Sequence, residues 1–180
     1  MNQVKNILTS SSWKTSNAFK NIGNKKTQTQ YYLENNSTEE VMKLACLESK
    51  PFGSEVEKII REILTLTNRT STQNDATFNS KKIEIKAARY WAGKDNCKWQ
   101  HLESNHDYNY VLFVLLDFTG FKIWGIKKTT LMKDLVDKKI VVKQGEQGYW
   151  TDKNKIISHL TVINNIKDLE NLTSDNIMEV

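Results

Sequence analysis

The sequence predicts one α/β domain of the α+β kind, in which a mixed central β-sheet is flanked by helices. Residues 108–117 are almost continuously apolar, as in a buried central strand, and 121–126 follow after a turn as its antiparallel partner. Residues 54–64 carry apolar side chains at the spacing of an amphipathic helix. With 180 residues, the chain is long enough to bury a substantial core without disulfides.

Two capping patterns predict where the helices begin. Ser37 to Glu40 places an N-cap serine three residues before a glutamate, which predicts a helix over 38–49 that ends at Pro51. Ser54 to Glu57 repeats the pattern and predicts the start of the amphipathic helix. Acidic residues in a first helical turn also stabilise the helix dipole, so this role is an alternative to a functional one.

The N-terminal segment, residues 1–36, is rich in Ser, Thr, Asn, Gln and Lys. We expect either an arm that serves dimerisation or DNA contact, or a mobile terminus. Residues 37–180 are predicted to form a single domain.

The second half of the chain supplies further elements. We expect a short helix over 97–102, a helix over 130–137 and a short strand over 139–142. Residues 143–155 interrupt the apolar pattern with glycine, amides and charges, which predicts an exposed loop. An apolar segment, 156–163, is predicted to return to the body of the domain before a last helix or tail.

Composition excludes some classes of protein. The balance of 26 Lys and Arg against 21 Asp and Glu weakly favours a polyanionic partner. Cys46 and Cys97 have no metal-ligand spacing and the N-terminus has no secretory apolar core, so we expect a reducing, cytoplasmic location. The longest apolar run is too short for a membrane span, and the lack of a glycine-rich phosphate loop argues against a nucleotide cofactor.

A strand over 81–86 carries the most unusual charge pattern in the chain. Side chains alternate between the two faces of a strand, so Ile83 and Ile85 are expected to enter the core. Glu84 and Lys86 then project together from the opposite face. Charge pairs on strands are also common as solvated surface features, which is the alternative interpretation.

Asp75 precedes a short strand that is expected to turn back at Asn79 and Ser80. Such a hairpin brings its carboxylate near Glu84, so two carboxylates and the ammonium of Lys86 share one cleft. Paired carboxylates form a hard-oxygen site suited to Mg²⁺, and a lysine beside them can orient water and offset charge on a phosphate. The pattern favours cleavage of phosphodiester bonds.

These residues resemble a known family. The succession of residues 53–60, Asp75 and residues 83–89 is similar to the PD-(D/E)XK nuclease superfamily, and most similar to its small type II restriction endonucleases. The resemblance covers about 51–126 and implies a restriction-endonuclease-like core. The proline that the family motif places before the acid is absent, since Asn74 precedes Asp75.

The resemblance also implies roles for the residues at matching positions. The implied metal ligands are Asp75, Glu84 and Ile85. Lys86 corresponds to the catalytic lysine, and Glu57, or else Glu55, to an additional acid carried by a helix. Gln100 lies where related nucleases often carry a glutamine-bearing helix near the active site.

The function implied is Mg²⁺-dependent hydrolysis of double-stranded DNA at a short specific sequence by a homodimer that acts on a palindrome. The loop over 143–155 is the candidate for sequence recognition. The candidate DNA-contacting residues are Lys82, Arg89, Lys98, Gln100, Gln144, Gln147 and Asn154. A structure-specific repair or phage nuclease of the same fold, or a DNA-binding protein without catalysis, are the alternatives.

Overall fold

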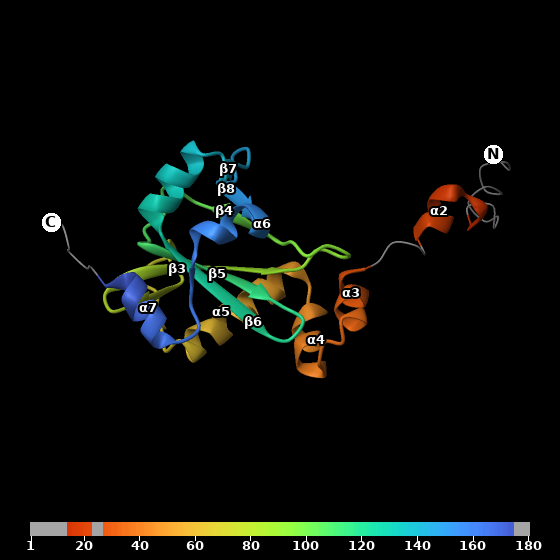
Figure 1. The fold of residues 1–180 in the computed structure, drawn as a ribbon, viewed down its shortest axis with the longest axis horizontal. Helices are drawn as coiled ribbons and strands as arrows, with labels where there is room; N and C mark the ends of the chain where they lie inside the picture. Colours follow the sequence, from red (N-terminus) through yellow and green to blue (C-terminus); the bar gives the residue numbers. More distant parts are fainter. Residues whose placement is uncertain (1–13, 23–26, 175–180) are drawn as a thin grey trace, which may run out of the picture.

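The computed structural model describes residues 14–22 and 27–174. Its described part is built on a six-stranded sheet, which confirms the predicted mixed central sheet (Figure 1). In sheet order the strands are β1 (Thr67–Asn68), β2 (Ala76–Phe78), β3 (Lys81–Arg89), β5 (Tyr110–Leu116), β6 (Phe121–Lys127) and β9 (Thr161–Val162). Among these strands β3 and β5 run parallel, and the other neighbours are antiparallel.

The two hairpins that the sequence predicts are both present. Every residue of β5 is buried, and β5 pairs with β6 from Tyr110 opposite Lys127 to Leu116 opposite Phe121. β2 and β3 are joined by Asn79 and Ser80, whose φ angles are 47° and 64°. Two such residues form a hairpin turn that matches the natural twist of the strands.

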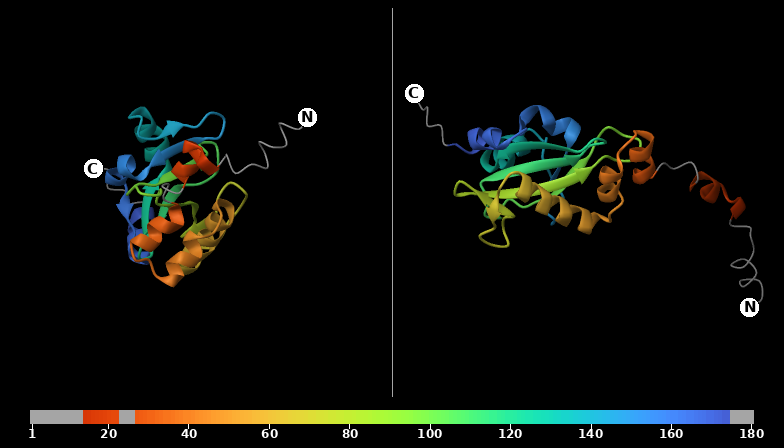
Figure 2. Two further views of the ribbon diagram at one scale, coloured as in Figure 1. Left: turned by 90° about the vertical axis from the view of Figure 1, so that its right-hand side faces the viewer. Right: turned by 90° about the horizontal axis from the view of Figure 1, so that it is seen from below.

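Helix α5 (Ser49–Ile63) lies along one face of the sheet (Figures 1 and 2). The predicted helix end at Pro51 is wrong, because α5 begins before this proline and includes it in the first turn, where its missing N–H costs no helical hydrogen bond. The predicted cap at Ser54 is wrong for the same reason, since Ser54 lies inside α5. The preceding helix, α4 (Glu39–Ala45), is capped by Thr38 and not by Ser37.

A second sheet covers the other face of the central sheet (Figure 1). In the described part of the chain its three strands follow the order β4 (Lys98–Leu102), β8 (Tyr149–Asp152) and β7 (Val142–Lys143). The helical segments η2 (Thr130–Leu135, a π-helix), α6 (Lys153–Ile156) and η3 (Ile157–His159) accompany it. The helix predicted over 130–137 is confirmed by η2.

Three predictions in this region are wrong. Residues 97–102 form strand β4 instead of a helix, because Trp99 enters the core while its neighbours do not, and aromatic residues favour strands. The strand predicted over 139–142 begins only at Val142, after a turn with positive φ at Lys139. The segment 143–155 is not an exposed loop, since β8 pairs with strands on both sides and Thr151 is buried.

The N-terminal segment contributes α2 (Asn17–Ile22) and α3 (Gln28–Glu34). Tyr32 of α3 is fully buried, and its hydroxyl donates a hydrogen bond to the carbonyl of Leu116 and accepts one from the N–H of Tyr90 at 3.0 Å. Residues 27–36 therefore pack against the end of the central strands. The rest of the predicted arm, residues 1–13 and 23–26, lies outside the described residues.

The C-terminal helix α7 (Ile166–Thr173) confirms the last predicted helix and packs on β6. A Cβ atom at Gly125 of β6 would lie 2.3 Å from the side chain of Leu172, so the glycine permits this close approach. Within the described ranges, no helix combines the length and the apolar character that crossing a membrane requires.

Candidate active site

Glu84 and Lys86 lie on the same face of β3 and form an ion pair, as the strand alternation predicts. Lys86 Nζ lies 2.6 Å from Glu84 Oε1. Glu84 is only 5% exposed, and the flanking Ile83 and Ile85 are also buried. A carboxylate this deeply buried is rare unless it is paired, so Lys86 supplies the compensating charge.

Asp75 lies across the hairpin from Glu84, directly before the first residue of β2. Its backbone N–H donates to the carbonyl of Ile83 at 2.9 Å, and its carboxylate Oδ2 accepts from the N–H of Ile85 at 2.7 Å. The side chain therefore continues the pairing with β3 beyond the start of β2, where no backbone partner among the described residues bonds to the N–H of Ile85. This arrangement holds the carboxylate beside the Glu84 and Lys86 pair.

The protonation of Glu84 reflects this setting. Burial is the main cause that raises the pKa of Glu84, the ion pair with Lys86 opposes it, and the negative charges of Asp75 and Glu57 add to it; together they bring the pKa to about 6. Glu84 is therefore ionised at neutral pH and takes up a proton in mildly acidic solution. A shifted carboxyl in a polar pocket is typical of functional sites.

Helix α5 brings Glu57, and not Glu55, toward these residues. Burial raises the pKa of Glu57, with the Asp75 charge as a further cause. Glu55 is paired instead with Lys58, at 2.8 Å on the exposed side of α5. Residues two apart in a helix point in nearly opposite directions, which explains the difference. Glu57 is therefore the helix-borne acid at this site.

Two of the three acidic residues and Lys86 open onto a pocket of about 510 Å³, whereas the buried Glu84 is not among its lining residues. Asp75, Lys86 and Glu57 line it together with Lys98 and Gln100, which come from β4. Gln100 thus reaches the site from a strand and not from the expected helix. The pocket lies between α5 and β4, beside β3, and is open to solvent on one side.

The wall made by β4 is connected to the hairpin of the second sheet. Gln100 Oε1 accepts a hydrogen bond from Gln144 Nε2 at 2.9 Å. Lys98 Nζ lies 3.9 Å from the centre of the Trp150 ring. Two of the candidate DNA-contacting residues in the pocket are therefore in direct contact with residues of the 143–155 segment.

The remaining candidate DNA-contacting residues are not gathered at the pocket in the same way. Arg89 lines the pocket, but its Nη1 donates to the carbonyl of Ala45 at 2.7 Å, and its guanidinium lies 4.4 Å from the Phe52 ring centre. Arg89 therefore connects β3 to the C-terminal end of α4 through this hydrogen bond. Lys82 forms an ion pair with Asp107 outside the pocket.

Gln147 and Asn154 are exposed on the second sheet and on α6. The backbone N–H of Gln147 donates to the carbonyl of Gln144 at 2.9 Å within the hairpin turn. The backbone N–H of Asn154 donates to Asn96 Oδ1 at 3.2 Å. Neither side chain lines the pocket.

Sequence reasoning missed two residues that shape the site. Arg61 lies one helical turn after Glu57, with Nε 3.9 Å from Glu57 Oε1, and its Nη1 donates to the carbonyl of Asp75 at 3.5 Å. The i, i+4 spacing of Glu57 and Arg61 is a signal that could have revealed this pair. Gln28, whose Nε2 donates to the carbonyl of Tyr90 at 2.5 Å, also lines the pocket and has no local sequence signal.

Asp75 and Glu84 offer carboxylate oxygens, which are the kind of ligand that Mg²⁺ prefers. In the described residues, no group of three or more His, Cys, Asp or Glu side chains is arranged to hold a metal ion. Mg²⁺ usually binds through one or two carboxylates and completes its shell with water and substrate phosphate, so Asp75 and Glu84 would suffice. Ile85, the third ligand that the resemblance implies, has a hydrocarbon side chain and could contribute only its backbone carbonyl.

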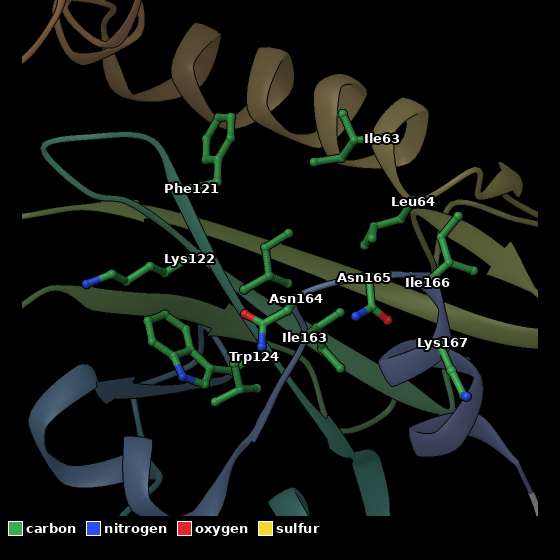
Figure 3. A pocket seen from close by; sticks show the side chains of 12 residues that line it. Ile63, Leu64, Phe121, Lys122, Trp124, Ile163, Asn164, Asn165, Ile166 and Lys167 are labelled. Atoms are coloured by element: carbon green, nitrogen blue, oxygen red, sulfur yellow. The ribbon is translucent and has the colours of Figure 1, made fainter.

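A second pocket, shown in Figure 3, has a different character. It lies between the end of α5, the start of β6 and the start of α7, and Ile63, Phe121 and Ile163 are among its lining residues. Its lining includes no carboxylate. The carboxylates that the sequence singles out are therefore not part of this second pocket.

Comparison with known proteins adds no family assignment. A scan against protein-family models finds no match for the chain, and neither does a search of the curated proteins. The fold and the site define a mixed α/β protein in which a buried carboxylate pairs with a lysine that lines an open pocket.

Proposed function

We propose that the protein is a Mg²⁺-dependent endonuclease that hydrolyses double-stranded DNA at a short specific sequence, with a restriction-endonuclease-like core. The observation that supports this most directly is the ion pair between the buried Glu84 and Lys86, which lies close to Asp75 and Glu57; Lys86, Asp75 and Glu57 line one pocket. A purely structural role does not require two carboxylates and a lysine to line one solvent-open pocket, or a third, buried carboxylate to pair with that lysine.

Asp75, Glu84 and Lys86 would have different roles in phosphodiester hydrolysis. Asp75 and Glu84 would hold Mg²⁺, which when bound supplies Lewis-acid stabilisation of the phosphate and a more acidic water. Lys86 Nζ positions the attacking water and offsets negative charge on the phosphate. Water adds to phosphorus as the bond to the 3′ oxygen breaks, which leaves a 5′ phosphate and a 3′ hydroxyl.

The state of Glu84 links this chemistry to pH. Metal binding requires the ionised carboxylate, and burial raises the pKa of Glu84 to about 6. Activity should therefore rise through this region as the pH increases. Lys86 supports the ionised form at neutral pH, so the two residues act as one unit.

Recognition of a short symmetric site is most simply achieved by a homodimer, in which each copy cuts one strand. Lys98 and Gln100 in the pocket wall contact Trp150 and Gln144 of the second sheet. We propose that this sheet reads base edges in the major groove, where amide side chains pair well with adenine. Its cations would contact phosphates, which also makes binding dependent on salt.

The test is digestion of a defined plasmid with purified protein, in Mg²⁺ and with a chelator. We expect discrete fragments with Mg²⁺ and none with chelator, and neither Glu84→Ala nor Lys86→Ala should cut. Cleavage that either substitution leaves unchanged would contradict the proposed site. A smear or branch-specific cutting would instead favour a structure-specific nuclease, and DNA binding without any cutting would favour a non-catalytic protein.

A further inference from the structure

Strand β3 has an unpaired edge beside the active site. On one side, β3 pairs with β5 along its length from Ile83 to Arg89. On the other side, β2 covers only the beginning of β3 and pairs with it no further than Ile83. Asp75 extends the pairing by one step through its side chain, and beyond that point no strand of the described residues pairs with this edge.

Hydrogen bonds on both sides of β3 show where each backbone group points. Lys82 both donates to Asn109 Oδ1 and accepts from the N–H of Asn109, each at 2.8 Å, on the side of β5. The carbonyl of Ile83 and the N–H of Ile85 bond to Asp75 on the side of β2. Because backbone groups alternate along a strand, the odd-numbered residues of this segment point away from β5.

The same alternation directs the backbone of Ala87 to the unpaired edge. Ala87 lines the active-site pocket together with Asp75 and Lys86. Its N–H therefore points into the pocket, directly after the residue whose ammonium pairs with Glu84. The carbonyl of Ile85 points to the same side, so the edge presents an acceptor close to Asp75 and then a donor.

We infer that the N–H of Ala87 binds a non-bridging phosphate oxygen of the DNA strand that is cut. The inference rests on the proposed function, since it concerns the substrate of that site. Backbone N–H groups are common phosphate ligands, and they fix the position of a strand without reading its sequence. A donor on a rigid central strand, one residue from Lys86, would hold the strand in a fixed register against the catalytic groups.

Proline at position 87 tests this inference, because it removes the N–H. Proline is tolerated where the N–H of an edge strand faces solvent, and the N–H of Ala87 makes no bond to β5. Ala87→Gly keeps the N–H and is the matched control. With a duplex oligonucleotide that carries the mapped cleavage site, we expect kcat/KM to fall roughly 10- to 100-fold in Ala87→Pro and to fall much less in Ala87→Gly, which retains the N–H.

A second measurement separates a direct contact from a disturbance of the strand. Methylphosphonates, which lack one charged oxygen, are placed in turn at each phosphate around the cleavage site. At one position the replacement should weaken binding to the wild type but not weaken binding to Ala87→Pro any further. If Ala87→Pro is unfolded by circular dichroism, an amide-to-ester replacement at Ala87 removes the same N–H without the proline ring.

The outcomes distinguish this inference from the proposed function. If the wild-type protein cuts no DNA, the proposed function fails. If the wild type cuts and the folded Ala87→Pro or ester protein cuts equally well, only the inference about Ala87 is overturned. It is also overturned if every methylphosphonate has the same effect on both proteins.

Discussion

Two ion pairs involve side chains of β3 on the same face, and they differ in their surroundings. The side chains of Lys86 and Glu84 are 20% and 7% exposed, whereas those of Lys82 and Asp107 are 33% and 55% exposed. An exposed pair of this kind is worth about 0–1 kcal/mol and can be replaced with little effect. A buried pair must offset the loss of hydration, so stability alone is a weak reason to keep it.

The difference identifies which pair belongs to the chemistry of the protein. Only the buried pair faces further carboxylates, Asp75 and Glu57, and the pKa of Glu84 is raised by burial and by those charges. Lys82 lies two residues before Glu84 on β3, and its partner is the exposed carboxylate of Asp107. Lys82 and Lys86 are therefore the same residue type on the same face of β3. They differ because only Lys86 lines the pocket that also contains Asp75 and Glu57.

The largest expected effect is the loss of Lys86. Lys86→Met should lower DNA cleavage by roughly 100- to 10,000-fold, because the charge beside the phosphate and the water is removed. Without its cation, the pKa of Glu84 should also rise further, since Lys86 is the neighbour that lowers it. Initial rates with Mg²⁺ across a range of pH measure both effects.

Lys82→Met is the matched control on the same strand face. It should change the free energy of unfolding by about 0–1 kcal/mol and leave the rate of the chemical step near that of the wild type. Single-turnover cleavage separates that step from DNA binding. Equal losses in the chemical step of both variants would show that burial does not distinguish the two pairs.

The next largest expected effect is on folding stability, and it arises from the raised pKa of Glu84. Its pKa is raised from 4.5 in the unfolded chain to about 6 in the folded protein, so the folded state binds more protons between these values. The contribution of Glu84 to stability is therefore present below pH 4.5 and is lost as the pH rises through about 6. The loss should be about 1–2 kcal/mol.

Glu84→Gln carries no titrating group at this position. The wild type should lose stability relative to this variant as the pH rises from 4.5 to 6.5, measured by urea unfolding at several pH values. If the two proteins keep a constant difference across that range, the raised pKa of Glu84 is contradicted.

The site was more predictable from the sequence than the elements around it. Asp75, Glu84 and Lys86 belong to one hairpin with a two-residue turn, so local alternation and turn chemistry were enough to bring them together. The same holds for the hairpin of β5 and β6, whose apolar pattern is continuous. Short-range periodicity is the strongest structural signal that a sequence carries.

Predictions failed where distant parts of the chain decide the outcome. Trp99 donates its indole N–H to the carbonyl of Val114 at 3.0 Å, and β4 pairs with β8 some fifty residues later, so the strand at 98–102 depends on contacts that local pattern does not show. Gln28 and the bond between Gln100 and Gln144 reach the pocket in the same non-local way. Tertiary contacts override local propensity in these segments.

The smallest effect extends the contrast between buried and exposed groups to the two acids of α5. Glu57 is 31% exposed beside Asp75, and burial raises its pKa, whereas Glu55 is 48% exposed and paired with Lys58. Glu57→Gln should lower kcat/KM roughly tenfold, equivalent to about 1.4 kcal/mol, because its carboxylate adds negative charge near the proposed metal ligands. The kcat/KM of Glu55→Gln should stay within about twofold of the wild-type value, since the Glu55 carboxylate points away from the pocket.

Titration of Mg²⁺ in the cleavage assay distinguishes the two acids. Glu57→Gln should require a higher Mg²⁺ concentration for its half-maximal rate than Glu55→Gln. If both variants require the same concentration, neither acid lies at the site.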